Sequence, residues 1–364
     1  MTPRIAACSC RTALGNAEAT CDALLDGQRA LRPLPVQGAA GGDAVPLACI
    51  GGRALDESAP PEWLPILDGL AAEIPNGPWG HARHPVFLTS SNFGVGSLYA
   101  YQRTRERAHV AYGTPYQVGE ILRGRFGWGP DLTLCSHACV SAHLGLLAAE
   151  RRLRAGTADR ALVFSFDFIS PFVTGGFHAL KILNGEFPAP YADRPTGAIG
   201  LGDGAAFAVL DQSPSGPALR CQSLHNEMHH FTANRPDGGG FRAGLEPLRA
   251  ESAGRRLWLK GHGTGTLEAG RLEAQTLAEL FPQAPLISWK GSLGHTLGSC
   301  GLVELALALA AVRRGRIPAT VGTSGPCFSE SVALAPLRAS DFDGFILASN
   351  AFGGAHAAAL VCHD

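Results

Sequence analysis

The chain is poor in lysine, in charge overall and in long apolar runs. Charged residues make up 17% of its 364 residues and the formal net charge is −1, so nothing favours binding to nucleic acid or to an anionic membrane. The longest apolar run, residues 305–312, is too short to span a bilayer. Residues 1–15 contain no long apolar stretch, and we therefore expect no signal peptide and a cytoplasmic protein.

The ten cysteines form no CxxC pair, and no spacing between cysteine and histidine is repeated. We therefore expect no metal site and no disulfide framework, and reduced thiols in a cytoplasm fit better. The 30 basic residues include only three lysines, Lys181, Lys260 and Lys290. We attribute Lys181 and Lys260 to chance, whereas Lys290 enters the argument below.

Helical and strand-like segments alternate along the chain. We predict helices over residues 16–28, 62–73, 268–281 and 298–314, over most of residues 93–127 and directly after residue 139. We predict strands within residues 4–8, 85–92, 132–135, 160–167, 204–211, 218–225, 255–263, 285–291, 344–350 and 356–363. Residues 168–200 are expected to be irregular and residues 231–246 to form a glycine-rich loop. This alternation predicts parallel sheets sandwiched by helices, with a boundary near residues 213–217.

Residues 135–156 hold the strongest candidate for a nucleophile. Cys139 lies between the end of a buried strand and the start of an amphipathic helix. The positive end of a helix favours a thiolate over a thiol, which makes the sulfur nucleophilic. The alternative is that Cys139 is a small buried apolar residue, as most free cysteines are.

Two later segments each place a histidine beside glycine. In residues 260–274, His262 follows a strand, and Thr264 and Thr266 offer hydroxyls beside it; a loop histidine without a function is the alternative. In residues 288–312, His295 follows a glycine and precedes a helix.

Glu304 interrupts the apolar helix that follows His295, where an unpaired carboxylate would be costly. We predict an ion pair with Lys290; the alternative is that Glu304 faces solvent at the edge of the helix. Near the C-terminus, Phe352 precedes Gly353 and Gly354. Such a turn can present backbone N–H groups to an oxyanion, or it is an ordinary turn.

One cysteine, two histidines and one lysine suggest a reaction in which each group has a separate chemical role. The Cys139 thiolate attacks an acyl thioester and holds the acyl group covalently. The neutral His262 and His295 rings donate hydrogen bonds to the carbonyl of a second thioester and stabilise the enolate that forms when its carboxylate leaves as carbon dioxide. The charge of Lys290 steadies the cluster and biases one histidine toward its neutral form.

These segments resemble the motifs of the beta-ketoacyl-[acyl-carrier-protein] synthases, the decarboxylating condensing enzymes of the thiolase superfamily. SHACVSAH resembles the nucleophile turn, GHGTGT the first histidine motif, KGSLGHTLGSCGLVE the motif of lysine, second histidine and glutamate, and AFGGAHA the terminal Phe-Gly-Gly gate. The resemblance implies an α/β fold with the thiolase-like five-layer α-β-α-β-α architecture, built from two related βαβαβ halves. It implies that residues 1–215 carry the nucleophile and residues 216–364 the two histidines and the gate.

The resemblance also implies the role of each site residue. It implies catalytic Cys139, His262, His295 and Lys290, supporting Glu304 and Phe352, and substrate-binding Thr264, Thr266, Gly353 and Gly354, with no metal. The backbone N–H groups of Cys139 and Phe352 would form the oxyanion hole. The chain departs from the family at His137, where Thr or Ser is usual, and at Gly270, where Asp is usual, although Glu273 matches the glutamate that follows.

The implied activity is decarboxylating condensation of a cysteine-bound acyl group with malonyl-acyl carrier protein, in fatty acid or polyketide-like synthesis such as that of aryl polyenes. The implied partner is acyl carrier protein, whose phosphopantetheine carries the substrate, and no separate cofactor is expected. A homodimer is implied, and a heterodimer with a chain-length factor stays open.

The alternative is that this chain is itself a non-catalytic chain-length factor, but such a subunit has no need for all four catalytic residue types. A thiolase-like enzyme would need a second cysteine near AFGGAHA, and none is there.

Overall fold

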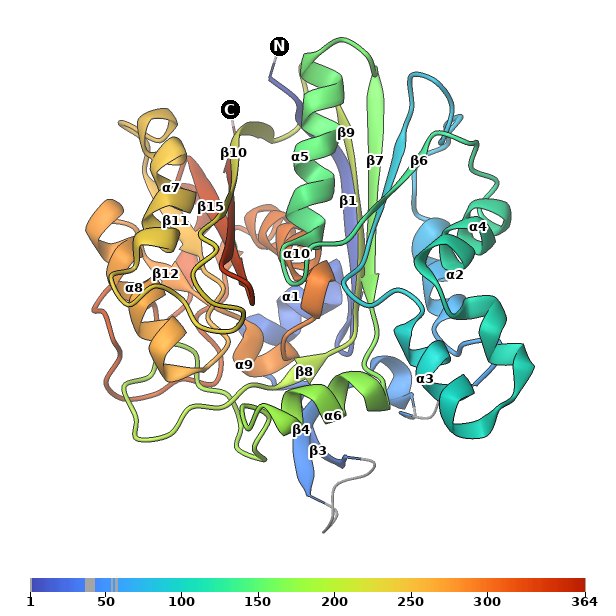
Figure 1. Ribbon diagram of the computed structural model, residues 1–364. Helices are drawn as coiled ribbons and strands as arrows, with labels where there is room; N and C mark the ends of the chain where they lie inside the picture. The colour runs from blue at the N-terminus through green and yellow to red at the C-terminus, as the bar shows by residue number, and fades with distance from the viewer. Residues whose placement is uncertain (1, 37–42, 54, 56–57, 364) are drawn as a thin grey trace.

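The computed structural model describes residues 2–36, 43–53, 55 and 58–363, and most of their strands join in one mixed sheet (Figure 1). Its strands are β1 Arg4–Thr12, β2 Gly15–Asn16, β5 Val86–Thr89, β6 Leu132–Cys135, β7 Arg160–Asp167, β9 Gly204–Asp211, β10 Ala218–Asn226, β11 Leu257–Lys260, β12 Leu286–Ile287, β15 Gly344–Ala351 and β16 Ala355–Cys362. They lie in the order β12-β11-β15-β16-β10-β1-β9-β7-β5-β6, with β2 paired to β1.

The two halves of this sheet repeat one pattern. The order β6-β5-β7-β9-β1 in the first half matches β12-β11-β15-β16-β10 in the second, strand for strand in chain order. In each half the first two pairings are parallel and the last two antiparallel, so the predicted parallel pairing is confirmed for the first two and wrong for the last two. Two related α/β halves are confirmed, and they meet where Arg4 pairs with Ala218. The predicted boundary at residues 213–217 falls between β9 and β10; the division into two domains there stays a prediction.

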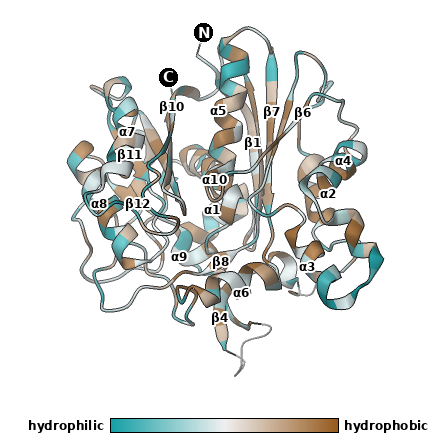
Figure 2. Cartoon of the chain, viewed as in Figure 1, coloured by the Kyte–Doolittle hydropathy of each residue, from teal (hydrophilic) through white to brown (hydrophobic). Residues whose placement is uncertain are grey.

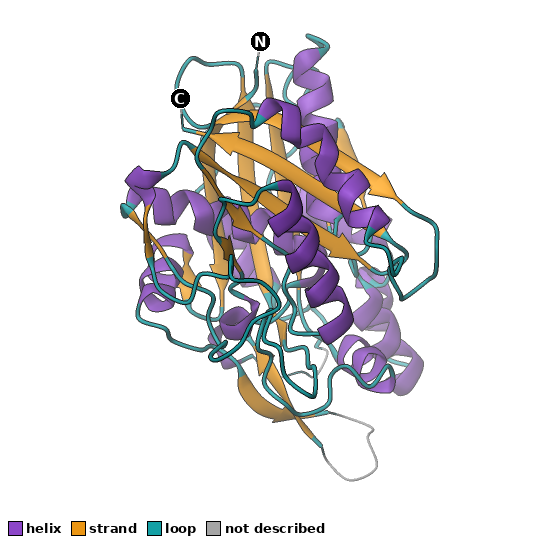
Figure 3. Cartoon of the chain, turned by 90° about the vertical axis from the view of Figure 1, so that its left-hand side faces the viewer, coloured by secondary structure: helices purple, strands orange, loops and turns teal. Residues whose placement is uncertain are grey.

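Helices form three layers around the two half-sheets, as Figures 1 and 3 show from two sides. The central layer holds α5 and α10: α5 packs on β5 and β7, and α10 packs on β1, β9 and β15. On the outside, α2 packs on β1 and β9 and α4 on β6, whereas α7 packs on β10 and β16. The helices are α1 Ala17–Leu25, α2 Leu64–Ala71, α3 Val95–Thr104, α4 Pro115–Arg125, α5 Ser141–Arg154, α6 Pro171–Ala179, α7 Gly239–Glu251, α8 Leu267–Leu280, α9 Lys290–Leu293 and α10 Cys300–Arg313. No helix in the described part of the chain is long and apolar enough to cross a bilayer.

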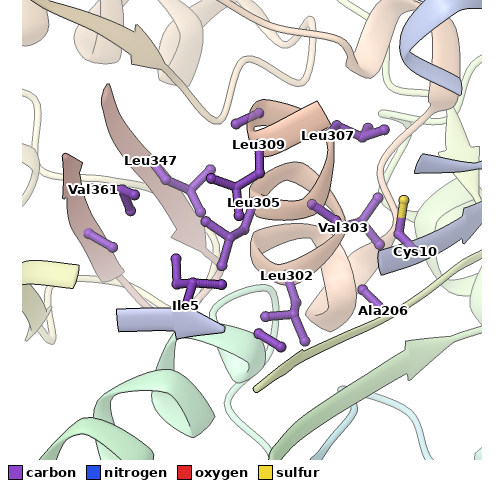
Figure 4. Close-up of a cluster of buried hydrophobic side chains, with 14 of the residues drawn as sticks. Ile5, Cys10, Ala206, Leu302, Val303, Leu305, Leu307, Leu309, Leu347 and Val361 are labelled. Carbon is purple, nitrogen blue, oxygen red and sulfur yellow. The ribbon is translucent and has the colours of Figure 1, made fainter. Parts of the chain in front are cut away.

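Helix α10 forms the centre of the largest hydrophobic cluster (Figure 4). Its sequence is apolar on almost every side, which is typical of a helix buried between two layers. Leu305 and Leu309 point toward Leu347 of β15, and Val303 points toward Cys10 of β1. By contrast, the outer helices α7 and α8 change between hydrophilic and hydrophobic along their length in Figure 2, as expected of helices with one buried face.

The prediction of a glycine-rich loop over residues 231–246 is wrong in its second half, because α7 begins at Gly239. These glycines serve close packing rather than flexibility. A Cβ on Gly240 would lie 2.0 Å from Glu227 Oε2, and one on Gly244 would lie 2.8 Å from His356 Cβ. Composition alone does not separate these two uses of glycine.

Several short strands were not predicted from the sequence. Strands β3 Arg32–Pro35 and β4 Ala44–Ala48 pair with each other, and β4 pairs with β8 Leu201–Gly202. Strands β13 Arg316–Ile317 and β14 Leu337–Arg338 form a second small sheet. Strands this short have too few residues to show a period. Helix α6 lies in the region expected to be irregular.

Candidate active site

Cys139 lies in a constrained turn between β6 and α5. Ala138, the residue before it, has a φ of +44°, in the left-handed region that residues with a side chain rarely adopt. Ser141 holds the turn, because its hydroxyl accepts a hydrogen bond from the His137 N–H at 2.8 Å and donates one to the Ala138 carbonyl at 2.7 Å. Strain of this kind is tolerated where the surroundings over-determine the backbone, and it fixes the direction of the Cys139 side chain.

One cavity of about 210 Å³ brings the three predicted reacting groups together. Cys139 from the first half of the chain and His262 and His295 from the second half all line it. Phe352, Thr264 and Thr266 line it too. The hydroxyls of Thr264 and Thr266 are 3.1 Å apart and form a polar edge on an otherwise largely apolar wall. Gly353 and Gly354 are not among the lining residues; they turn the chain after Phe352 at φ values of +85° and +73°.

The two histidines face each other as neutral rings. Their ring centroids are 4.8 Å apart and the ring planes are nearly perpendicular, at 89°. Burial lowers the pKa of both His262 and His295 well below its ordinary value, and the nearby charge of Lys290 lowers it further. Nδ1 of His262 and both ring nitrogens of His295 have no hydrogen-bond partner among the described residues. Buried ring nitrogens without partners in a cavity wall are available to a ligand oxygen.

A buried carboxylate positions the backbone that carries His262. Glu273 of α8 accepts hydrogen bonds from the N–H groups of His262 at 2.6 Å and Gly263 at 2.9 Å. The Tyr191 hydroxyl donates to Glu273 at 3.0 Å, and the Asn350 side-chain amide donates to it at 3.1 Å. The sequence pointed to Glu273 through the resemblance alone; its partners Tyr191 and Asn350 carried no signal in the sequence.

The predicted ion pair between Lys290 and Glu304 is confirmed. Lys290 Nζ lies 2.6 Å from Glu304 Oε1, and both residues are buried. The alternative of a solvent-facing Glu304 is therefore wrong. Lys260 Nζ lies 3.0 Å from the same carboxylate oxygen and is completely buried, so the attribution of Lys260 to chance is wrong too.

Two opposing effects act on the ionisation of Cys139. Burial raises the pKa of the Cys139 thiol above its ordinary value, although the charge of Lys290 acts in the opposite direction. Burial therefore opposes the ionisation that the helix start was predicted to favour. The side chain stays partly exposed in the cavity, and it must lose its proton when it attacks.

Gly298 allows the His295 segment to approach the Cys139 turn. A Cβ at this position would lie 2.7 Å from Ser91 N, 2.9 Å from Ala138 O and 2.9 Å from Asp167 Oδ2. Gly298→Ala is therefore expected to lower the free energy of unfolding by about 1–3 kcal/mol, measured by urea denaturation. The control is Gly124→Ala in α4, where a Cβ meets nothing within 4 Å and about 0.5–1 kcal/mol of stabilisation is expected. Equal effects of the two substitutions would contradict this packing argument.

Among the described residues, no three histidine, cysteine, aspartate or glutamate side chains are grouped as metal ligands would be. The residues that the structure brings together are one sulfur, two imidazoles and a buried charged cluster.

A family model and the curated sequence relatives both show similarity to beta-ketoacyl synthases. Residues 222–324, which include both histidines, match the model of the beta-ketoacyl synthase C-terminal domain. The chain is 25% identical over 252 residues to 3-oxoacyl-[acyl-carrier-protein] synthase 2 of Coxiella burnetii, covering 62% of this chain and 59% of that protein. It is 27% identical over 274 residues to the tetracenomycin polyketide synthase ketoacyl synthase alpha subunit of Streptomyces glaucescens, covering 69% and 64%. The chain spans about three-fifths of the length of each of these two relatives.

Solved structures share the whole fold. A type II polyketide ketosynthase in complex with its acyl carrier protein (AntDE:AntF) matches with a TM-score of 0.85 and 14% identity, over 100% of this chain and 99% of that one. The ketosynthase ApeO in complex with its chain length factor ApeC, from Xenorhabdus doucetiae, matches with a TM-score of 0.79 and 22% identity, over 99% and 98%. Residues 222–324 thus match the beta-ketoacyl synthase C-terminal domain, the sequence relatives are ketoacyl synthases, and the solved ketosynthases share the fold of the whole chain.

Proposed function

We propose that this chain is a beta-ketoacyl-[acyl-carrier-protein] synthase that joins a cysteine-bound acyl group to malonyl-acyl carrier protein. The observation that carries the proposal is that Cys139, His262 and His295, from distant parts of the chain, line one cavity. A sulfur nucleophile and two neutral N–H donors are the groups that acyl transfer and enolate stabilisation need.

In the first step the Cys139 sulfur attacks the carbonyl carbon of an acyl thioester. The new carbon–sulfur bond forms as the bond to the carrier's sulfur breaks, and the thiol proton passes to the departing thiolate. The carrier leaves as a free thiol, and the acyl group stays on Cys139. The partly exposed sulfur at the cavity wall is accessible for this attack. The N–H groups of Cys139 and Phe352 are proposed to bind the oxyanion that forms.

In the second step a malonyl thioester loses carbon dioxide. The electron pair of the broken carbon–carbon bond moves onto the thioester as an enolate, whose oxygen accepts hydrogen bonds from His262 and His295. The enolate carbon then attacks the acyl carbonyl on Cys139, and the cysteine leaves as a thiolate that takes a proton from water. The product is a beta-ketoacyl thioester on the carrier. Because the histidines stay neutral, they donate hydrogen bonds without protonating the carbanion.

The partners follow from the substrate. We propose that the malonyl and acyl groups arrive on the phosphopantetheine of acyl carrier protein, that Thr264 and Thr266 bind this arm, and that Phe352 gates the cavity. No further cofactor enters the steps above. A homodimer is proposed, with a chain-length-factor heterodimer as the other arrangement, and the cytoplasm as the compartment that keeps Cys139 reduced. The product class, fatty acid or polyketide-like lipid, depends on the acyl chain accepted.

A direct test is to incubate the protein with acyl-pantetheine thioesters of graded chain length and to measure its intact mass. We expect an increase equal to one acyl group, located on Cys139 by peptide mapping. A Cys327→Ala protein is the control, because Cys327 is partly exposed outside this cavity. An adduct that persists in Cys139→Ala, or no adduct with any thioester, would overturn the proposal, and the second result would favour a non-catalytic chain-length factor.

A further inference from the structure

Lys260 is a buried ammonium group that the mechanism above does not use. It is the last residue of β11, two residues before His262, and its side chain is completely buried. Its Nζ lies 3.0 Å from Glu304 Oε1 and donates a hydrogen bond to the Gly261 carbonyl at 2.6 Å. The ammonium also lies 5.5 Å from the centre of the Trp289 ring, in cation–π range.

The cluster formed by Lys260, Lys290 and Glu304 carries more positive than negative charge. Both ammonium groups contact the same oxygen of Glu304, at 3.0 Å and 2.6 Å. One carboxylate therefore balances two buried cations, and the surplus positive charge lies beside the histidines. A positive charge in a water-excluded site disfavours a second one nearby, which here means a protonated imidazole.

The same side chain also fixes the backbone that presents His262. The carbonyl that Lys260 binds belongs to Gly261, the residue directly before His262. On the other side of the histidine, the Ser288 hydroxyl donates to the Gly263 carbonyl at 2.8 Å, while Glu273 accepts from the His262 N–H. Lys260 thus acts on His262 in two ways: its hydrogen bond fixes the backbone that carries the ring, and its charge disfavours protonation of the ring.

We propose that Lys260 is a positioning residue for the proposed condensation. The surplus positive charge of its cluster keeps His262 and His295 unprotonated, so that both rings act as hydrogen-bond donors. The inference rests on the proposed function for its role in catalysis, but its effect on the two rings is independent of substrate. Lys260 lowers the pKa of both histidines, after burial and Lys290 for His295 and after burial, Lys290 and His295 for His262. The pKa of Lys260 itself is lowered to about 8, mainly by burial. The other titratable groups that face this cluster are Lys290 of α9, Glu304 and Cys300 of α10, Glu273 of α8, His143 of α5, Tyr191 and Cys139.

The test compares Lys260→Met with Lys260→Gln, which keeps a hydrogen-bond donor but has no charge. The readout is the pH profile of kcat/KM for carbon dioxide release from malonyl-pantetheine. Without the ammonium charge the histidines bind protons more readily, so the acidic limb of the profile is expected to move to higher pH by about one unit in both variants. Arg249→Met is the control, because it removes one exposed positive charge from α7, which pairs with Glu246 on the surface. Its acidic limb is expected to coincide with that of the wild type.

Two results would overturn the proposal: an acidic limb that does not move in either variant, or one that moves in Lys260→Met but not in Lys260→Gln. The second would assign the effect to the hydrogen bond to Gly261 rather than to charge. Titration of ring-labelled histidines by NMR, with His262 and His295 assigned through asparagine variants, provides the same comparison without catalysis. If the wild type releases no carbon dioxide, the proposed function fails, while the NMR titration still decides whether Lys260 sets the protonation of the two rings.

Discussion

Cys139→Ala is expected to abolish condensation, with a fall in kcat of at least about 10⁴-fold, because alanine cannot hold the acyl group covalently. Ala138 and Ser141 fix the turn through the backbone and the Ser141 hydroxyl, so the cavity should persist in the variant. The measurement is formation of beta-ketoacyl-pantetheine from an acyl-pantetheine and malonyl-pantetheine, followed by mass spectrometry. Continued condensation by the alanine variant would end the mechanism proposed above.

The same geometry predicts that condensation and decarboxylation can be separated. Cys139→Gln should still release carbon dioxide from malonyl-pantetheine, because both neutral imidazoles remain in the cavity wall. His262→Ala or His295→Ala should lose both activities, by about 10²–10³-fold, since each removes one donor to the enolate oxygen. His81→Ala, at an exposed histidine outside the cavity lining, is the matched control and should change neither. Equal loss of decarboxylation in Cys139→Gln and the two histidine variants would show that the groups do not divide the work in this way.

The bounds of long elements with clear ends could be predicted from the sequence, but the direction in which the strands pair could not. Strands β7 and β9 were predicted at the residues where they occur, because both are continuous apolar runs with clear ends. The antiparallel pairing of β9 with β7 and β1 was missed, since a buried strand shows the same residue pattern in either direction. The start of α7 at Gly239 was missed because close packing against Glu227 and His356, not flexibility, selects its glycines.

The site was predictable where a residue is unusual for its own segment. Glu304 stands out in an apolar helix, and that anomaly alone led to its partner Lys290. Lys260 ends a buried strand and is anomalous in the same way, but its partner lies 44 positions further along the chain and shares no local pattern with it. The pKa of Cys139 depends on how the cavity excludes water, which is a property of the folded chain and not of the helix start.

Glu304→Gln is expected to be the most destabilising substitution in this cluster, with a loss of about 3–5 kcal/mol in the free energy of unfolding at neutral pH. Glutamine keeps the size of the side chain but removes the negative charge that, among the described residues, contacts the ammonium groups of Lys260 and Lys290. Two buried cations without a counter-charge are more costly than the intact cluster. Urea denaturation measures the loss, and Glu279→Gln is the control: Glu279 pairs with Arg242 on the surface, so a change of about 0.5 kcal/mol or less is expected.

The pH dependence of the stability of Glu304→Gln shows whether the loss comes from the missing charge or from the altered side-chain shape. Burial already lowers the pKa of Lys260 to about 8 in the presence of Glu304, and loss of the carboxylate lowers it further. Because the unfolded chain then binds more protons than the folded one up to about pH 10.4, the stability of Glu304→Gln should rise with pH across this range. Adding Lys260→Met removes one of the two unpaired cations and should recover part of the stability at neutral pH. If the double variant is no more stable than Glu304→Gln, the loss comes from the shape of the side chain, and the surplus charge assigned to this cluster does not exist.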